Sequence, residues 1–177
     1  MQTFDEVPVD ALVWCRPDRQ THRFELRRDQ AVVSTLIFDP PPTFAWGQTA
    51  RRSALAEGAN SKWSLTVRRR GFLGMKGDVQ VQGANSGALE AGYLLRRGTL
   101  TISEMQDYQW LGGIAEGSFD VFTDLQGMPV LRLDRGDMFE GINARVSVLS
   151  GAAPARDVVL LATVGLYMRL LMDKVYE

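Results

Sequence analysis

The stretch VVLLATVGLYMRLLM, residues 158–172, decides how this chain folds. It has no polar stripe at the 3.6-residue period of a helix, so a helix formed here is apolar on every side and must be enclosed by protein or by lipid. Pro154 suits a first helical turn, and Asp157 and Lys174 lie near the helix ends that the dipole favours for their charges. We therefore predict a helix over about residues 155–175.

The length of this apolar segment favours protein as its surroundings. Residues 158–172 span roughly 22 Å at 1.5 Å per residue, against about 30 Å of bilayer hydrocarbon. Arg169 also interrupts the segment. We therefore expect the helix to be buried in the chain's own core, and we predict no transmembrane span. A membrane anchor is the alternative.

From about residue 11 to residue 149, short segments alternate between apolar and polar residues, which is typical of antiparallel strands with one dry face. We count roughly ten to twelve such segments, the spacing of a sandwich or barrel. The alternating apolar residues include Phe24, Leu26, Trp63, Leu65, Val67, Val79, Val81, Leu100, Ile102, Leu131, Leu133, Ala144, Val146 and Val148. Turn-forming residues separate the segments at 16–19, 39–42, 58–60, 83–87, 96–98 and 126–129.

The composition limits the classes of function that this chain can have. The 177 residues carry 20 basic and 21 acidic side chains, so no overall charge draws the chain to nucleic acid. Cys15 and His22 are the single cysteine and the single histidine, which excludes an internal disulfide and is too few for a structural zinc site. We expect one cytoplasmic domain over residues 1–177, with no cofactor, no metal and no nucleic-acid partner.

The order of elements, a dozen or so strands and then one apolar helix, resembles the tubby C-terminal-like superfamily, which includes tubby proteins, phospholipid scramblases and LURP-one-related proteins. The resemblance implies a mainly β fold: a closed antiparallel barrel of about 12 strands around a central hydrophobic C-terminal α-helix. Residues 69–76, RRGFLGMK, are similar to the Arg-x-x-Phe-Leu-Gly-x-Lys segment of tubby proteins. By this resemblance Arg69 contacts the phosphate of a phosphoinositide head group. Val67 stands where tubby proteins have a further lysine.

The basic run itself is a candidate anion site. On a strand, Arg68 and Arg70 share one face and Arg69 points to the other. Arginine forks, Lys76 and the glycine-rich backbone amides between them are groups that hold phosphate. The alternative is a solvated strand end.

The sequence therefore predicts a non-enzymatic binding or scaffold domain that recognises an anionic lipid head group or a small ligand at Arg68, Arg69, Arg70 and Lys76. It predicts a location in the cytoplasm, peripheral to a membrane. No catalytic residues are predicted, because Cys15 and His22 have no evident third group to orient the base. Two alternatives remain: a membrane-tethered, scramblase-like protein, and an enzyme with its site at one mouth of the barrel.

Overall fold

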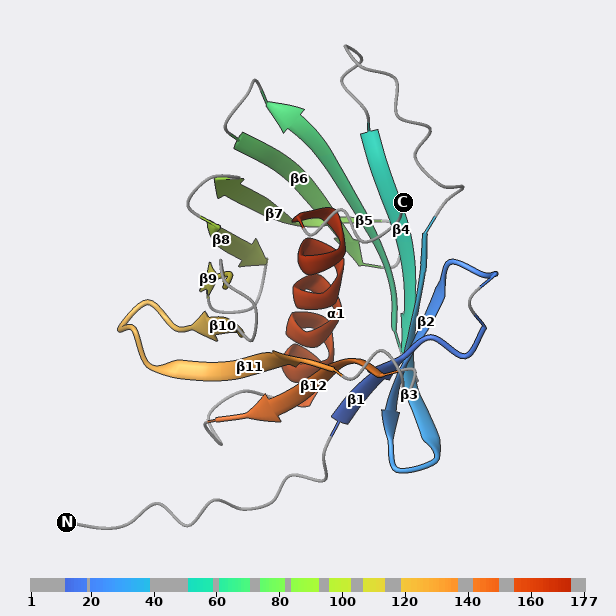
Figure 1. Ribbon diagram of the computed structural model, residues 1–177. Helices are drawn as coiled ribbons and strands as arrows, with labels where there is room; N and C mark the ends of the chain where they lie inside the picture. Colours follow the sequence, from blue (N-terminus) through green and yellow to red (C-terminus); the bar gives the residue numbers. More distant parts are fainter. Residues whose placement is uncertain are drawn as a thin grey trace, which may run out of the picture.

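The computed structural model describes residues 12–18, 20–38, 51–58, 61–70, 74–81, 84–92, 96–102, 107–113, 119–136, 142–149 and 155–172. These residues form twelve strands and one helix (Figure 1). The elements are β1 (Leu12–Cys15), β2 (Arg23–Arg28), β3 (Ala31–Phe38), β4 (Arg51–Gly58), β5 (Ser61–Arg70), β6 (Gly74–Val81), β7 (Ala84–Gly92), β8 (Arg97–Ile102), β9 (Tyr108–Leu111), β10 (Asp120–Thr123), β11 (Pro129–Arg135), β12 (Ile142–Val148) and α1 (Ala155–Met172).

The strands form a closed antiparallel barrel. Each strand pairs with its neighbours in sequence, and β1 pairs with β12 to close the ring. The predicted closed barrel with a C-terminal helix is confirmed. Closure pairs both sides of every strand, so the sheet has no free edge to attract another chain.

The predicted alternation is visible in the burial of the strands. In β5 the side chains of Trp63, Leu65 and Val67 are buried, whereas Ser64 and Thr66 between them are partly exposed. In β2 the alternation has one exception, because Glu25 is buried between Phe24 and Leu26. The Glu25 carboxylate is paired with Arg23 at 3.1 Å and Arg27 at 2.6 Å, which compensates for its burial.

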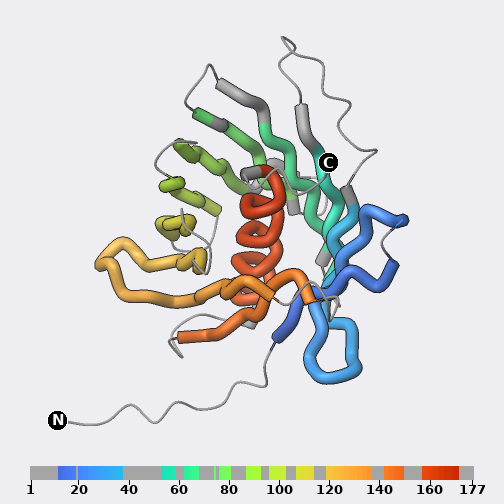
Figure 2. Tube along the Cα trace, viewed as in Figure 1, coloured from blue at the N-terminus to red at the C-terminus, as the bar shows by residue number. Residues whose placement is uncertain are grey.

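Helix α1 lies inside the ring of strands (Figures 1 and 2). Every side chain from Asp157 to Leu171 is buried except that of Val159, which is partly buried. The helix is apolar on all sides because strands surround it on all sides. The prediction that this segment is buried in protein is confirmed. Within the described residues, no helix has the length and apolar character needed to cross a membrane.

Gly165 lets the helix approach the barrel wall closely. A Cβ atom there would lie 2.7 Å from Leu133 Cδ1 and 3.0 Å from Phe122 Cε2. Both of these side chains are fully buried in β10 and β11. The absence of a side chain at Gly165 therefore sets how tightly α1 packs against these two strands.

Polar contacts at three heights attach the apolar helix to the barrel. The Tyr108 hydroxyl donates to Asp157 Oδ2 at 3.0 Å, and Trp14 Nε1 donates to the Ala162 carbonyl at 3.2 Å. Near the other end, Arg169 Nε donates to Asp120 Oδ2 at 2.6 Å. Buried polar groups that are paired in this way favour one rotation and one height of the helix in the barrel.

One predicted turn is wrong and a second is only partly right. Residues 84–87 belong to β7, and Arg97 and Gly98 belong to β8, with Arg96 at φ 44° in the turn before it. The glycines serve close strand contact instead: a Cβ atom at Gly98 would lie 2.6 Å from the Glu90 carbonyl oxygen of the neighbouring strand. The predicted turn at 39–42 and predicted helix residues 173–175 lie outside the described ranges.

Candidate functional site

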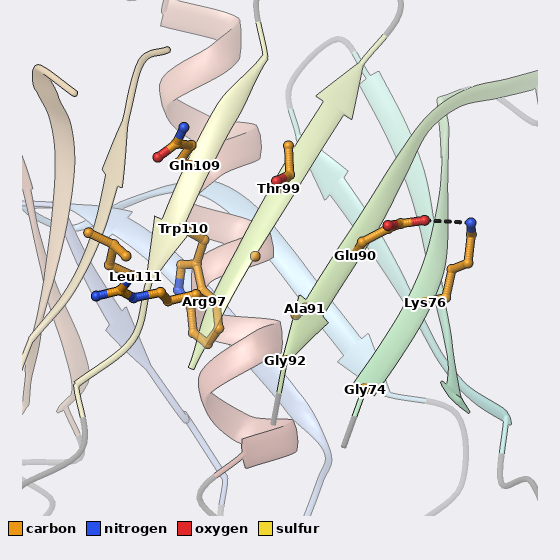
Figure 3. Close-up of a pocket in the computed structure, with 11 residues that line it drawn as sticks. Gly74, Lys76, Glu90, Ala91, Gly92, Arg97, Thr99, Gln109, Trp110 and Leu111 are labelled. Atoms are coloured by element: carbon orange, nitrogen blue, oxygen red, sulfur yellow. Dashed lines mark ion pairs between the residues drawn. The ribbon is translucent and has the colours of Figure 1, made fainter. Parts of the chain in front are cut away.

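A depression of about 470 Å³ lies in the barrel wall across β6, β7, β8 and β9 (Figure 3). This volume is within the range of small-molecule sites. Its lining residues are Gly74, Lys76, Glu90, Ala91, Gly92, Arg97, Gly98, Thr99, Gln109, Trp110 and Leu111.

The strand register arranges the exposed and partly exposed lining residues in two rows on the outer face. Lys76, Glu90, Thr99 and Gln109 lie directly opposite one another on successive strands, and we call them the polar row. Gly74, Gly92, Arg97 and Leu111 form the next row, two positions further along each strand, and we call them the glycine row. Side chains of one row are about 5 Å apart between neighbouring strands, so members of a row can bind one ligand together.

Gly74 and Gly92 line the depression and lie directly opposite each other, so no side chain covers this part of it, and we call this pair the glycine floor. On one side of this floor, the side chains of Lys76 and Glu90 turn toward each other (Figure 3). On the other side, the Arg97 side chain extends toward Leu111 (Figure 3). The middle of the depression is therefore bare backbone between charged side chains of both signs.

The two cations of the depression differ in their pairing. Lys76 forms an ion pair with Glu90, but the two side chains are 53% and 59% exposed, so water screens the pair strongly. Arg97 is exposed and has no ion-pair partner within the described residues. The depression therefore holds one paired and one unpaired cation at the edges of a glycine floor.

The inner side of the same wall belongs to the core. Ala91 and Trp110 are buried, and the Trp110 Nε1 group has no hydrogen-bond partner within the described part of the chain. Trp14 and Trp63 are buried too, so these three tryptophans serve the core, as expected for inward positions. Trp46 lies outside the described residues.

The predicted basic run adjoins this depression. Lys76 is one of its lining residues. The register places Arg68 of β5 directly opposite Lys76, and Arg70 opposite Gly74. Residue 68 thus continues the polar row and residue 70 continues the glycine row. Arg69 lies opposite Met75, at the position between these two rows. The side chains of residues 68–70 are outside the described part of the structure, so their role stays a prediction.

The residues that sequence reasoning missed are Glu90, Arg97, Thr99 and Gln109. Each belongs to a strand whose alternation is readable, but only the register brings them beside Lys76. The sequence carries a partial signal in β7 and β8. Glu90 lies between the apolar residues Leu89 and Ala91, and Thr99 precedes Leu100, so alternation places both on the polar face. Within the described residues, no group of histidine, cysteine, aspartate and glutamate side chains could hold a metal ion.

Comparison with known proteins gives no match: no family model fits the sequence, and no curated protein or solved structure is similar to the chain. The resemblance to the tubby-like superfamily therefore stays a prediction that rests on the order of elements and on residues 69–76. The class of protein that the structure defines is a closed twelve-stranded barrel with an internal C-terminal helix and a depression with charged edges on its outer wall.

Proposed function

We propose that this protein is a non-enzymatic binding domain that holds the anionic group of a lipid head group or a small ligand on the outer face of β5–β8. The observation that carries the proposal is the position of Lys76 and Arg97 on either side of the glycine floor formed by Gly74 and Gly92. An anion on this floor would be within reach of an ammonium group and a guanidinium group. Its close approach to the backbone is possible because no side chain covers the floor.

The charges on neighbouring strands support an anionic ligand. Arg51 of β4 lies directly opposite Arg68 of β5, which lies directly opposite Lys76 of β6. Like charges in directly opposed positions of a sheet are destabilising. Basic residues at directly opposed positions of three consecutive strands are therefore a register that a bound anion would favour. Glu90 neutralises the end of this series at Lys76.

The guanidinium group of Arg97 supports the same conclusion. Arginine is suited to phosphate and carboxylate because its planar fork donates two parallel hydrogen bonds. Arg97 is exposed, without an ion-pair partner in the described structure, and next to a glycine floor. The resemblance to the tubby-like superfamily proposes an anionic lipid for the neighbouring residues 69–76, so two separate lines favour one ligand chemistry.

The test is co-sedimentation of the protein with phosphatidylcholine vesicles that contain phosphatidylserine or phosphatidylglycerol. We expect binding to the anionic vesicles and not to phosphatidylcholine alone. Lys76→Ala, Arg97→Ala and Arg68→Ala should each weaken binding about fivefold, the effect of one basic residue near an anionic surface. Arg69→Ala tests the residue that the tubby resemblance singles out.

Lys62→Ala is the matched control. Lys62 is an exposed lysine that pairs with Glu57 across β4 and β5 at 2.8 Å, as Lys76 pairs with Glu90 across β6 and β7. It lies outside the depression. Loss of binding in Lys62→Ala equal to that in Lys76→Ala would show nonspecific charge attraction. Failure of the wild-type protein to bind any anionic vesicle, together with failure to bind inorganic phosphate, would refute the proposed function.

A further inference from the structure

We propose that the depression takes a zwitterionic ligand, whose negatively charged group binds Arg97 and whose primary ammonium group binds Glu90. The inference rests on the proposed anion-binding function and adds the class of ligand. It follows from the fact that the depression contains a carboxylate as well as cations.

Glu90 and Arg97 lie on adjacent strands in a diagonal arrangement. Glu90 of β7 is opposite Thr99, and Gly92, two residues further along β7, is opposite Arg97. Diagonal residues of neighbouring strands are about 7–8 Å apart, which is within reach of long side chains and leaves room between them. Their side chains turn to opposite sides, Glu90 toward Lys76 and Arg97 toward Leu111 (Figure 3). The space over Gly92 therefore lies between the strand position of a carboxylate on β7 and that of a guanidinium on β8, and a ligand that spans it can reach both groups.

The Lys76 side chain shows how this carboxylate receives an ammonium group. Lys76 Nζ contacts Glu90 Oε1, and both side chains are more than half exposed. An ionised carboxylate can accept several hydrogen bonds through its two oxygens. Glu90 can therefore bind a ligand ammonium group beside Lys76 or in its place. The bound state would be an alternating series of charges from Lys76 through Glu90 and the ligand to Arg97.

Glu90 also disfavours ligands that lack a cation. An anion bound by Arg97 over Gly92 lies about 8 Å or less from the Glu90 position, and repulsion between two like charges about 8 Å apart in water lowers affinity about twofold. A ligand whose ammonium group contacts the Glu90 carboxylate gains about fivefold in affinity, the effect of opposite charges about 4 Å apart in water. Glu90 should therefore separate zwitterions from plain anions, whereas Lys76 and Arg97 alone would bind both.

The test uses two pairs of probes that differ in the ammonium group. O-phosphoethanolamine and propyl phosphate are nearly isosteric soluble probes. Vesicles that contain phosphatidylserine or phosphatidylglycerol carry equal net charge, and only the phosphatidylserine head group has an ammonium. The proteins are the wild type, Glu90→Gln and the matched control Glu57→Gln, which removes an equivalent exposed carboxylate opposite Lys62.

We expect the wild type and Glu57→Gln to prefer the ammonium probes by about fivefold or more. Glu90→Gln should weaken binding of the ammonium probes and strengthen binding of propyl phosphate, so that the two affinities change in opposite directions. Preference for phosphatidylserine over phosphatidylglycerol would identify a lipid as the source of the head group. Preference for O-phosphoethanolamine over propyl phosphate, without a preference between the vesicles, would identify a free small molecule. Either result supports a zwitterionic ligand.

Two other results separate the inferences. If the wild type binds both members of each pair equally and Glu90→Gln raises both affinities, the zwitterion is refuted and the anion site stands. If the wild type binds no probe in either pair, the proposed function fails and the zwitterion fails with it.

Discussion

Two regions of the barrel wall differ in the size of the residues that face inward and outward. Helix α1 approaches β3, β4, β10, β11 and β12 most closely, whereas the depression lies across β6–β9. Near the helix, small residues give it room at two places: Ala54 and Ala56 of β4 face the barrel interior, and Gly165 of the helix meets the large side chain of Leu133.

In the second region, large side chains reach inward from the wall. Leu100, Tyr108 and Trp110 are all buried on the inner face of β8 and β9. On the outer face of the same region, Gly74 and Gly92 leave the backbone bare. Glycine in a strand weakens it by roughly 0.5–1 kcal/mol relative to alanine. The comparison teaches that packing against α1 constrains the residues beside the helix. The residues on the outer face of β6–β9 do not pack against α1, so this constraint does not apply to them.

Removal of α1 should have the largest effect. A chain that ends at residue 154 would expose the inner faces of all strands and leave the lumen of the barrel unfilled. We expect an insoluble product, or a molten one that binds a hydrophobic dye and lacks cooperative thermal unfolding. A soluble truncated chain that unfolds cooperatively would show that the barrel is stable without its helix.

Breaking the buried ion pair at the end of α1 should have the next largest effect. The side chains of Asp120 and Arg169 are only 2% and 9% exposed, and Arg169 Nη2 also donates to the Leu133 carbonyl at 2.8 Å. Asp120→Ala leaves the guanidinium buried without its counter-charge, so we expect a loss of about 3–5 kcal/mol in the free energy of unfolding, measured by chemical denaturation.

The matched control for this pair lies on the outer surface. Asp134 pairs with Arg132 at 2.5 Å, with the two side chains a third or more exposed. Asp134→Ala should cost no more than about 1 kcal/mol, because solvent screens an exposed pair. The double variant Asp120→Leu/Arg169→Met should recover most of the loss. Equal effects of Asp120→Ala and Asp134→Ala would contradict the special role of the helix end.

Filling the depression should change stability least. Gly92→Val places a side chain on the floor and replaces a flexible residue in a strand, so we expect the free energy of unfolding to stay within about 1 kcal/mol of the wild type and to rise if it changes. Ligand binding should be lost, because the side chain occupies the space between Glu90 and Arg97. A stable Gly92→Val variant that binds vesicles like the wild type would place the binding site elsewhere.

The fold was largely predictable from the sequence, and the candidate site only in part. Alternation in the strands and the apolar residues 158–172 predicted the barrel and its internal helix. Lys76 was predicted as a site residue because it follows a basic run. Glu90 and Arg97 were not, because their importance depends on which strands pair and in which register. Local composition also misplaced residues 84–87 and 97–98 in turns, since glycine serves close strand contact as well as turns.

The same division holds for the polar contacts of the helix. Arg169 reads in the sequence as an interruption of an apolar segment, and its partner Asp120 is 49 residues away. Asp157 reads as a residue that suits the helix dipole, and the structure adds its hydrogen bond to Tyr108. A long-range pair of this kind leaves no periodic signal, because no local spacing relates its two members.

By itself, the sequence determined which surfaces of this protein avoid water, since the periodicity of apolar residues follows directly from the geometry of strands and helices. The tertiary structure alone decided which polar residues meet, Lys76 with Glu90 and Arg169 with Asp120, and it alone placed Arg97 directly opposite Gly92. The physical reason is that hydrophobic burial is nondirectional and depends on local pattern, whereas ion pairs and ligand contacts require a particular register between strands that are distant in the sequence.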